Sequence, residues 1–449
     1  MRTTLQSLLV GSLLLSACGG GAPAAPNVLF IVTDTLRADR LGCYGSEAGL
    51  TPYLDQLAAE GLRFSDASSH APWTLPSIAS MLTSLHPAEH GAGGSLGGFK
   101  LMDPGVTTLP AVFKGRGWRT HAIANVAFLG EAFGTTRDFE STDIVAPTSN
   151  LEMRMASATT QAALDWLDKR DERPFFLFVH YFDPHAVYAP PSPFRERFAS
   201  GVDESFVFGT RKQMVDLRAG RLNVPAGVIR RAERLYNGEV AYMDAQIGRL
   251  LDGLDARGLD ESTVVLMTAD HGEEFLDHGG YEHGHTLYRE LTHVPLILRY
   301  PGRVSPGVDT TSVAHVDVAP TLCELADIAP PEQFLGRSLL AGASGAPDAE
   351  PRSILAHGNM WGEPLTSWRE GRYELIVGAG GRQELYDLES DPLQKRNLAQ
   401  EMPDRVTELR RGLDRVQLAL EALHRGQALD LAPEVLESLK EFGYVGGDQ

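Results

Sequence analysis

The chain has 449 residues, of which 43% are hydrophobic, and carries a formal net charge of −19. This content can bury a large core, so we expect one large domain and a smaller second one. The acidic balance repels phosphate backbones, and only scattered arginines oppose it, which argues against a nucleic-acid partner.

The N-terminus is typical of a secretory signal. In MRTTLQSLLVGSLLLSACGGG one early Arg precedes an apolar stretch that is too short to span a bilayer. The stretch ends in LSAC, which resembles a bacterial lipobox, so residues 1–17 are predicted as signal peptide and Cys18 as the lipidated residue. Residues 18–26 then form a flexible tether. Gly19 directly follows the cysteine and is not the aspartate that would signal retention in the inner membrane. We therefore expect a lipid-anchored protein on the periplasmic side of the outer membrane. The alternative is ordinary secretion with an incidental cysteine.

Two more cysteines, Cys43 and Cys323, lie far apart in the sequence. They could pair in an oxidising periplasm, but a single disulfide would not by itself hold a fold of this size together. We expect two buried thiols.

Five apolar runs are predicted as strands of a central, mainly parallel sheet. They are 27–33, 119–124, 174–181, 263–269 and 295–299, and helical patterns lie between them at 51–60, 76–85, 151–169, 236–256 and 315–326. Runs that are apolar on both faces suit a sheet covered by helices, and the alternation predicts an α/β sandwich. Site residues should then gather where strands end, as Asp34, His180 and Asp270 do.

After a Gly/Ala/Pro stretch at 340–352 the pattern changes. Short strands are predicted near 353–357, 372–377 and 384–388, a long amphipathic helix at 403–424 and a short helix at 432–446. We therefore expect the main domain to cover residues 27–345 and a small C-terminal α+β subdomain with terminal helices to cover residues 346–449.

Four stretches hold residues suited to chemistry. They are VTDTLRADRLGCYG (32–45), APWTLPSIASMLTS (71–84), FVHYFDPHAVY (178–188) and TADHGEEFLDHGGYEHGHTLYRELTHVPLIL (268–298). Asp34, Asp270 and His271 offer oxygen and nitrogen ligands for one divalent cation. Taken singly, Asp34 could cap a strand end and Asp270 with His271 could start a helix.

Thr74 stands just before Pro76 at the predicted mouth of a helix. A bound cation and the helix N-terminus would both favour ionisation of its hydroxyl, which suits a nucleophile. Thr74 could also be a simple N-cap, and the two roles are compatible. Ser77, one helical turn further, is the weaker candidate nucleophile.

These motifs, with MDAQIGRLLDGL, VDVAPTLCELADI and LYDLESDPLQKRNLA, resemble the sulfatase family of the alkaline-phosphatase superfamily. The resemblance covers nearly the whole chain after the leader. It implies an alkaline-phosphatase-like α/β/α sandwich in which residues 27–345 form the catalytic domain. The closing motif is typical of the family's C-terminal subdomain.

The resemblance also implies roles for single residues. Asp34, Asp270 and His271 match metal ligands, and Thr74 matches the nucleophile, which also touches the metal. His185 matches a histidine that contacts the charged oxygens of the substrate.

His285 falls where the family often places a lysine, in a register that is ambiguous by two residues with His283. We therefore predict His185 and His285 as catalytic residues beside the nucleophile. His180 and His283 are predicted to bind substrate.

Three departures from the family pattern bear on the chemistry. Family sulfatases convert Cys or Ser to formylglycine, which Thr74 cannot form, and Ile78 replaces the arginine of the maturation signature. Thr35 replaces a second acidic residue, and His271 stands where many members have asparagine. A plain alcohol leaves any covalent intermediate to be cleaved by water, which tilts the chemistry towards phosphate esters without excluding sulfate esters.

The expected function is metal-dependent hydrolysis of anionic sulfate or phosphate esters, on a small ester, glycan or lipid. One divalent ion is expected, with Mn²⁺ or Zn²⁺ favoured by the nitrogen of His271 and Ca²⁺ or Mg²⁺ possible. A rival arrangement adds a second metal on Asp183, His185 and His285. The alternative functions are a phosphoryl transferase acting on envelope lipids or glycans, and an inactive ligand-binding lipoprotein. The segment 186–235, which carries Arg195, Arg197, Arg211 and Lys212, either covers the site or forms solvated loops and a helix face.

Overall fold

The computed structural model describes residues 25–96, 98–146, 153–203, 205–340, 352–421, 427–428 and 431–441. The predicted signal peptide, Cys18 and the predicted domain boundary at 345 lie outside these ranges. Within them, no helix is both long and apolar enough to cross a bilayer.

The core of the molecule is an eight-stranded sheet with the order β14-β2-β13-β9-β1-β8-β6-β7. In that order the strands are β14 (Gly307–Asp309), β2 (Leu62–Phe64), β13 (Leu296–Arg299), β9 (Thr263–Ala269), β1 (Asn27–Thr33), β8 (Phe175–Tyr181), β6 (Arg119–Ala124) and β7 (Ser141–Ile144). The expectation of a mainly parallel sheet is confirmed. The run at 295–299 is the exception, because β13 pairs antiparallel with both β9 and β2.

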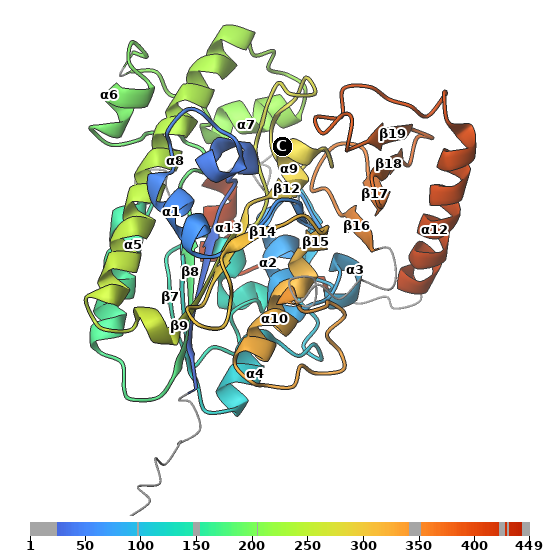
Figure 1. The fold of residues 1–449 in the computed structure, drawn as a ribbon. Coiled ribbons are helices and arrows are strands. Elements are labelled where there is room, and N and C mark those ends of the chain that lie inside the picture. The colour runs from blue at the N-terminus through green and yellow to red at the C-terminus, as the bar shows by residue number, and fades with distance from the viewer. Residues whose placement is uncertain are drawn as a thin grey trace, which may run out of the picture.

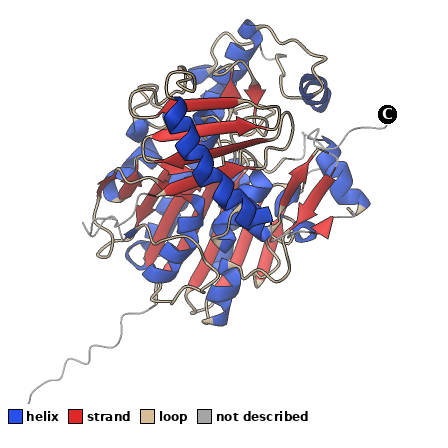
Figure 2. Cartoon of the chain, turned by 90° about the vertical axis from the view of Figure 1, so that its right-hand side faces the viewer, coloured by secondary structure: helices blue, strands red, loops and turns tan. Residues whose placement is uncertain are grey.

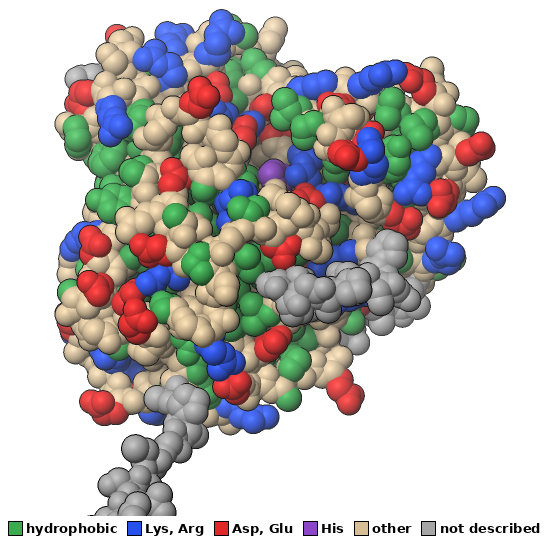
Figure 3. Space-filling model, viewed as in Figure 1, with side chains coloured by type: hydrophobic (Ala, Val, Ile, Leu, Met, Phe, Trp, Pro, Cys, Tyr) green, Lys and Arg blue, Asp and Glu red, His purple; other side chains and the backbone are tan. Residues whose placement is uncertain are grey.

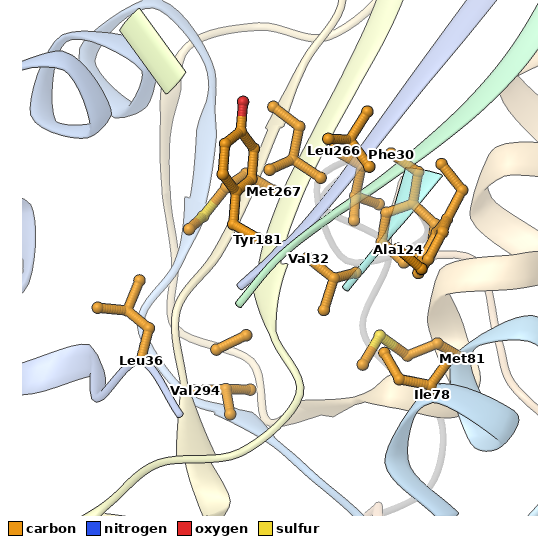
Figure 4. Packing of buried hydrophobic residues seen from close by; sticks show 14 of the residues in the cluster. Phe30, Val32, Leu36, Ile78, Met81, Ala124, Tyr181, Leu266, Met267 and Val294 are labelled. Carbon is orange, nitrogen blue, oxygen red and sulfur yellow. The ribbon is translucent and has the colours of Figure 1, made fainter. Parts of the chain in front are cut away.

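Helices cover both faces of this sheet, as Figures 1 and 2 show. One layer holds α1 (Pro52–Glu60), α5 (Ala156–Asp168) and α8 (Ala226–Asp255), and the other holds α2 (Thr74–Thr83), α4 (Leu109–Gly115) and α10 (Val318–Leu325). The central strands are buried throughout, which agrees with their continuous apolar sequence. Figure 4 shows side chains of β1 and β9 packed together, with Ile78 and Met81 of α2 below them.

Shorter elements join these layers. They are β3 (Ala67–Ser68), α3 (Pro87–His90), β4 (Gly93–Ser95), β5 (Gly98–Leu101), α6 (Phe194–Phe198), α7 (Arg211–Arg218), β10 (Glu274–Phe275), β11 (Tyr281–Glu282), α9 (Arg289–Thr292), β12 (His293–Val294) and β15 (Val313–Ala314). Cys43 and Cys323 are both free thiols, as expected, although Cys43 is only half-buried.

The C-terminal subdomain is an antiparallel sheet backed by one long helix, on the right of Figure 1. Its elements are β16 (Ser353–His357), β17 (Leu365–Glu370), β18 (Tyr373–Gly378), β19 (Gln383–Asp387) and α12 (Pro403–Glu421). Three of the four strands were expected, and β17 was missed. Leu355, Trp368 and Leu375 of the sheet form a small core with Leu409 and Leu413 of the helix.

The end of the chain returns to the main domain. β20 (Gln427–Ala428) pairs with β5, and α13 (Pro433–Glu441) places Leu439 in the large core. The last helix therefore packs away from the subdomain to which the sequence pattern assigned it.

Candidate active site

Three neighbouring parallel strands deliver the central residues of the site to one edge of the sheet. In the register, Thr33 of β1 lies opposite Ala269 of β9 and Tyr181 of β8. Asp34 and Asp270 follow directly, and backbone hydrogen bonds continue the pairing past the strand ends. This placement explains why residues 236 positions apart in the sequence meet.

Asp34, Asp270 and His271 form a compact, fully buried set. One ligand atom from each lies within 4.8 Å of the others, and this is the only such cluster of three or more His, Cys, Asp or Glu in the part of the chain that the structure describes. Both oxygens of Asp34 and Oδ2 of Asp270 are buried without a hydrogen-bond partner in the described structure. A cation would complete them, so the residues present fit one divalent metal ion.

The pKa shifts of Asp34 and Asp270 also favour a bound cation at this position. Burial raises the pKa of Asp34 well above its usual value, and the neighbouring carboxyls of Asp270 and Glu273 raise it further. Burial also raises the pKa of Asp270, although the ring of His271 opposes this. Two buried carboxyls that share a small space without a cation favour protonation, and a bound cation would reverse that preference.

The loop after Asp34 is held in an unusual conformation. Thr35 has a φ of 56°, which is uncommon for a residue with a branched side chain. Its N–H donates to Oδ1 of Asp270 over 3.2 Å, and its carbonyl accepts from the Tyr236 hydroxyl over 2.8 Å. The residue that replaces a second carboxylate therefore fixes Asp270 through its backbone. On the other side, Gly272 passes so close to the Glu290 carbonyl that a Cβ would lie 1.9 Å from its oxygen.

Thr74 is the first residue of α2 and is buried, with its Oγ1 3.4 Å from Nε2 of His271. The alternative of an N-cap is wrong, because Trp73 occupies that position and Thr74 already belongs to the helix. Ser77 instead contacts Ser69 Oγ over 2.7 Å and donates to the Ala71 carbonyl. Of the two candidate nucleophiles, Thr74 is the one beside the candidate metal ligands.

His180, which was predicted to bind substrate, lies directly beside Asp34 of the Asp34–Asp270–His271 set. Its Nε2 is 3.6 Å from Oδ2 of Asp34, and both ring nitrogens are buried without a hydrogen-bond partner in the described structure. Burial lowers the pKa of His180 to about 3, so the ring is neutral. It could therefore act as a further ligand.

His283 and His185 stand next to each other beside His271. The ring centroid of His283 lies 4.6 Å from that of His271 and 5.1 Å from that of His185. Nδ1 of His185 is 2.6 Å from the carbonyl of Ala186, and Nδ1 of His283 is 2.9 Å from Oε1 of Glu273. Burial lowers the pKa of both imidazoles well below the usual value.

His285 points elsewhere. Its Nε2 contacts Oε2 of Glu274 over 2.9 Å, and its ring stacks on Trp361 of the C-terminal subdomain at a centroid distance of 4.5 Å. Of the two histidines, His283 is therefore the neighbour of Asp34, Asp270 and His271. The rival second metal on Asp183, His185 and His285 has no matching cluster among the described residues.

Sequence reasoning missed three further residues that lie at or next to the site. Glu273 is fully buried and contacts His283, and Trp361 donates its indole N–H to the His283 carbonyl over 2.9 Å. Arg218 of α7 forms a buried ion pair with Glu282, the residue before His283. Figure 3 shows a histidine side chain at the base of a hollow between the main domain and the C-terminal subdomain. Glu273 directly follows the DHG triplet, and this position is the one sequence feature from which it could have been predicted.

Comparison with known proteins gives the family. Residues 26–328 match the family described as Sulfatase, and residues 277–419 match N-sulphoglucosamine sulphohydrolase, C-terminal. Among curated proteins, the Escherichia coli sulfatase YidJ is 27% identical over 83% of this chain and 83% of its own. Human iduronate 2-sulfatase is 28% identical over 68% of this chain and 66% of its own.

Solved structures agree on the fold. BT4656, solved with its substrate D-glucosamine-2-N,6-O-disulfate, aligns with a TM-score of 0.72 at 21% identity, over 89% of this chain and 99% of its own. The phosphonate monoester hydrolase of Agrobacterium radiobacter aligns with a TM-score of 0.70 at 19% identity, over 91% of this chain and 98% of its own. The chain thus belongs to the sulfatase family of ester hydrolases.

Proposed function

We propose that this protein hydrolyses small anionic phosphate or sulfate esters with Thr74 as its nucleophile. The observation that carries the proposal is the position of the Thr74 hydroxyl, buried at the start of α2 and 3.4 Å from a ring nitrogen of the Asp34–Asp270–His271 set. A plain alcohol at this point can attack phosphorus or sulfur but cannot release the product through an aldehyde.

Asp34, Asp270 and His271 would hold a divalent ion, with His180 beside them. When bound, the ion would lower the pKa of the Thr74 hydroxyl and offset the negative charge of the ester. The mixture of carboxylate oxygens and imidazole nitrogen favours Mn²⁺ or Zn²⁺ over Ca²⁺. The start of α2 adds a partial positive charge from its unpaired backbone N–H groups.

The chain's own groups then carry the reaction. Oγ1 of Thr74 loses its proton to the leaving group or to solvent and forms a bond to phosphorus or sulfur while the bond to the leaving oxygen breaks. The phosphate or sulfate ester left on Thr74 is then cleaved by water. His185 and His283 lie beside the set and are placed to contact the non-bridging oxygens or to transfer protons. We assign this role to His283 rather than His285, which packs against Trp361.

The substitution Thr74→Ala tests the proposal. With a phosphate diester, a phosphate monoester and an aryl sulfate as substrates, we expect turnover to fall by several orders of magnitude while the fold persists. Thr74→Ser should keep part of the activity because it keeps the hydroxyl.

A matched control is Thr83→Ala in the same helix. Thr83 is also buried, but its hydroxyl donates to the Ala79 carbonyl over 2.6 Å, so its loss affects only the helix. Wild-type rates in Thr74→Ala for all three substrates would refute the proposed nucleophile. The ranking of the substrates in the wild type decides between phosphate and sulfate esters.

A further inference from the structure

The hairpin formed by β10 and β11 places a carboxyl beside the histidine of the site. In its antiparallel register Glu274 lies opposite Glu282, so the next facing pair is Glu273 and His283. Their side chains meet, with Oε1 of Glu273 2.9 Å from Nδ1 of His283. Both side chains are buried, which makes this contact independent of solvent.

The carboxyl is itself fixed from a second direction. The Tyr188 hydroxyl donates to Oε2 of Glu273 over 2.9 Å, so each oxygen has one partner. Both carboxyl oxygens are therefore placed as acceptors, Oε2 for the Tyr188 hydroxyl and Oε1 for an N–H at Nδ1 of His283. Nε2 remains as the nitrogen with a lone pair.

The backbone of the same histidine is held by the C-terminal subdomain. Trp361 donates its indole N–H to the His283 carbonyl over 2.9 Å, and the Met360 N–H donates to the Gly284 carbonyl over 2.7 Å. Gly284 has a φ of 81°, a conformation that favours glycine. Ring and backbone are therefore both constrained, next to His271 and His185.

We propose that Glu273 is the positioning residue of His283, which it holds as the Nδ1–H tautomer so that Nε2 serves the second half of the reaction. This inference rests on the proposed function. In that step the water oxygen bonds to phosphorus and the bond from phosphorus to Oγ1 of Thr74 breaks. The proton of the water passes to Nε2 of His283 and from there to Oγ1 of Thr74.

The test compares Glu273→Gln with the wild type on a p-nitrophenyl phosphate diester. Formation of the Thr74 ester expels p-nitrophenolate, which needs no proton, so kcat/KM should change less than about threefold. Cleavage of that ester should slow about 10- to 100-fold, the usual effect of losing a residue that orients a functional histidine. We expect kcat and KM to fall together, with a burst of one equivalent of p-nitrophenol.

The matched control is Glu274→Gln, which makes the same change one residue away on the carboxyl that contacts His285. This variant should show neither the burst nor the loss in kcat. If Glu273→Gln lowers kcat/KM as much as kcat, or if both variants behave alike, Glu273 has only a structural role and the inference is wrong.

A second measurement does not depend on turnover. The ¹⁵N chemical shifts of the histidine rings should show His283 protonated at Nδ1 in the wild type and at Nε2 in Glu273→Ala. An unprotonated Nδ1 in the wild type would overturn the inference. Should Glu273→Ala fail to fold, Tyr188→Phe removes only the second hydrogen bond to Glu273 and should weaken the same preference. If Thr74→Ala kept wild-type turnover, the proposed function would fail while this tautomer could still be observed.

Discussion

Replacing the buried carboxyl of Asp34 should raise the stability of the metal-free protein and lower the stability of the metal-bound protein relative to the wild type. Its side chain is fully buried, and its ligand atom lies within 4.8 Å of that of Asp270. Two like unit charges 4.8 Å apart repel by about 3.5 kcal/mol at an effective dielectric constant of about 20. Without metal the carboxyl relieves this repulsion by taking up a proton, which agrees with its raised pKa.

The substitution Asp34→Asn removes the charge at nearly constant volume. We expect it to stabilise the metal-free protein by about 1–3 kcal/mol, less than the full repulsion because protonation already relieves part of it. The wild type should gain about 4.1 kcal/mol from Mn²⁺ at 1,000 times its Kd, and the variant much less. The order of stability of the two proteins therefore inverts when metal is added.

Thermal unfolding midpoints in EDTA and in excess Mn²⁺ measure this inversion. Asp244→Asn is the matched control, because Asp244 is also buried but accepts hydrogen bonds from the N–H groups of Tyr53 and Leu54 at the start of α1. It should be destabilised with and without metal, by an equal amount. A metal-free Asp34→Asn protein that unfolds below the wild type and gains as much from Mn²⁺ would refute the reasoning.

Three further predictions concern other parts of the molecule. Although burial raises it, Arg37 lowers the pKa of Asp277 to about 2, so Asp277→Asn should cost about 2 kcal/mol of unfolding free energy at pH 7. In urea titrations that loss should shrink as the pH falls from about 4 through about 2. Trp361→Phe keeps the stacking but loses one hydrogen bond to the His283 carbonyl, so kcat should fall about fivefold while the free energy of unfolding falls by only about 1 kcal/mol. Cys18→Ser should release the protein from membranes, as cell fractionation would show, and unchanged partition would contradict lipidation.

The sequence alone was sufficient to predict the edge of the sheet at which the candidate metal ligands meet. Asp34 and Asp270 each follow a run that is apolar on both faces, and such runs form adjacent parallel strands whose carboxyl ends meet at one edge. Local pattern therefore determined both the fold class and the cluster of candidate ligands. The same reasoning failed for β13, because a short apolar run carries no information about strand direction.

The choice between His283 and His285 was decided by tertiary structure. The two residues are separated by a single glycine, and which ring faces the metal set depends on how the loop packs against Trp361, more than 70 residues later in the sequence. The pairing of Glu273 with His283 likewise follows from the register of a hairpin of two-residue strands, which has no periodicity long enough to detect. Strand ends are positioned by the sheet to which they belong, whereas side chains in the connecting loops are oriented by whatever packs against them.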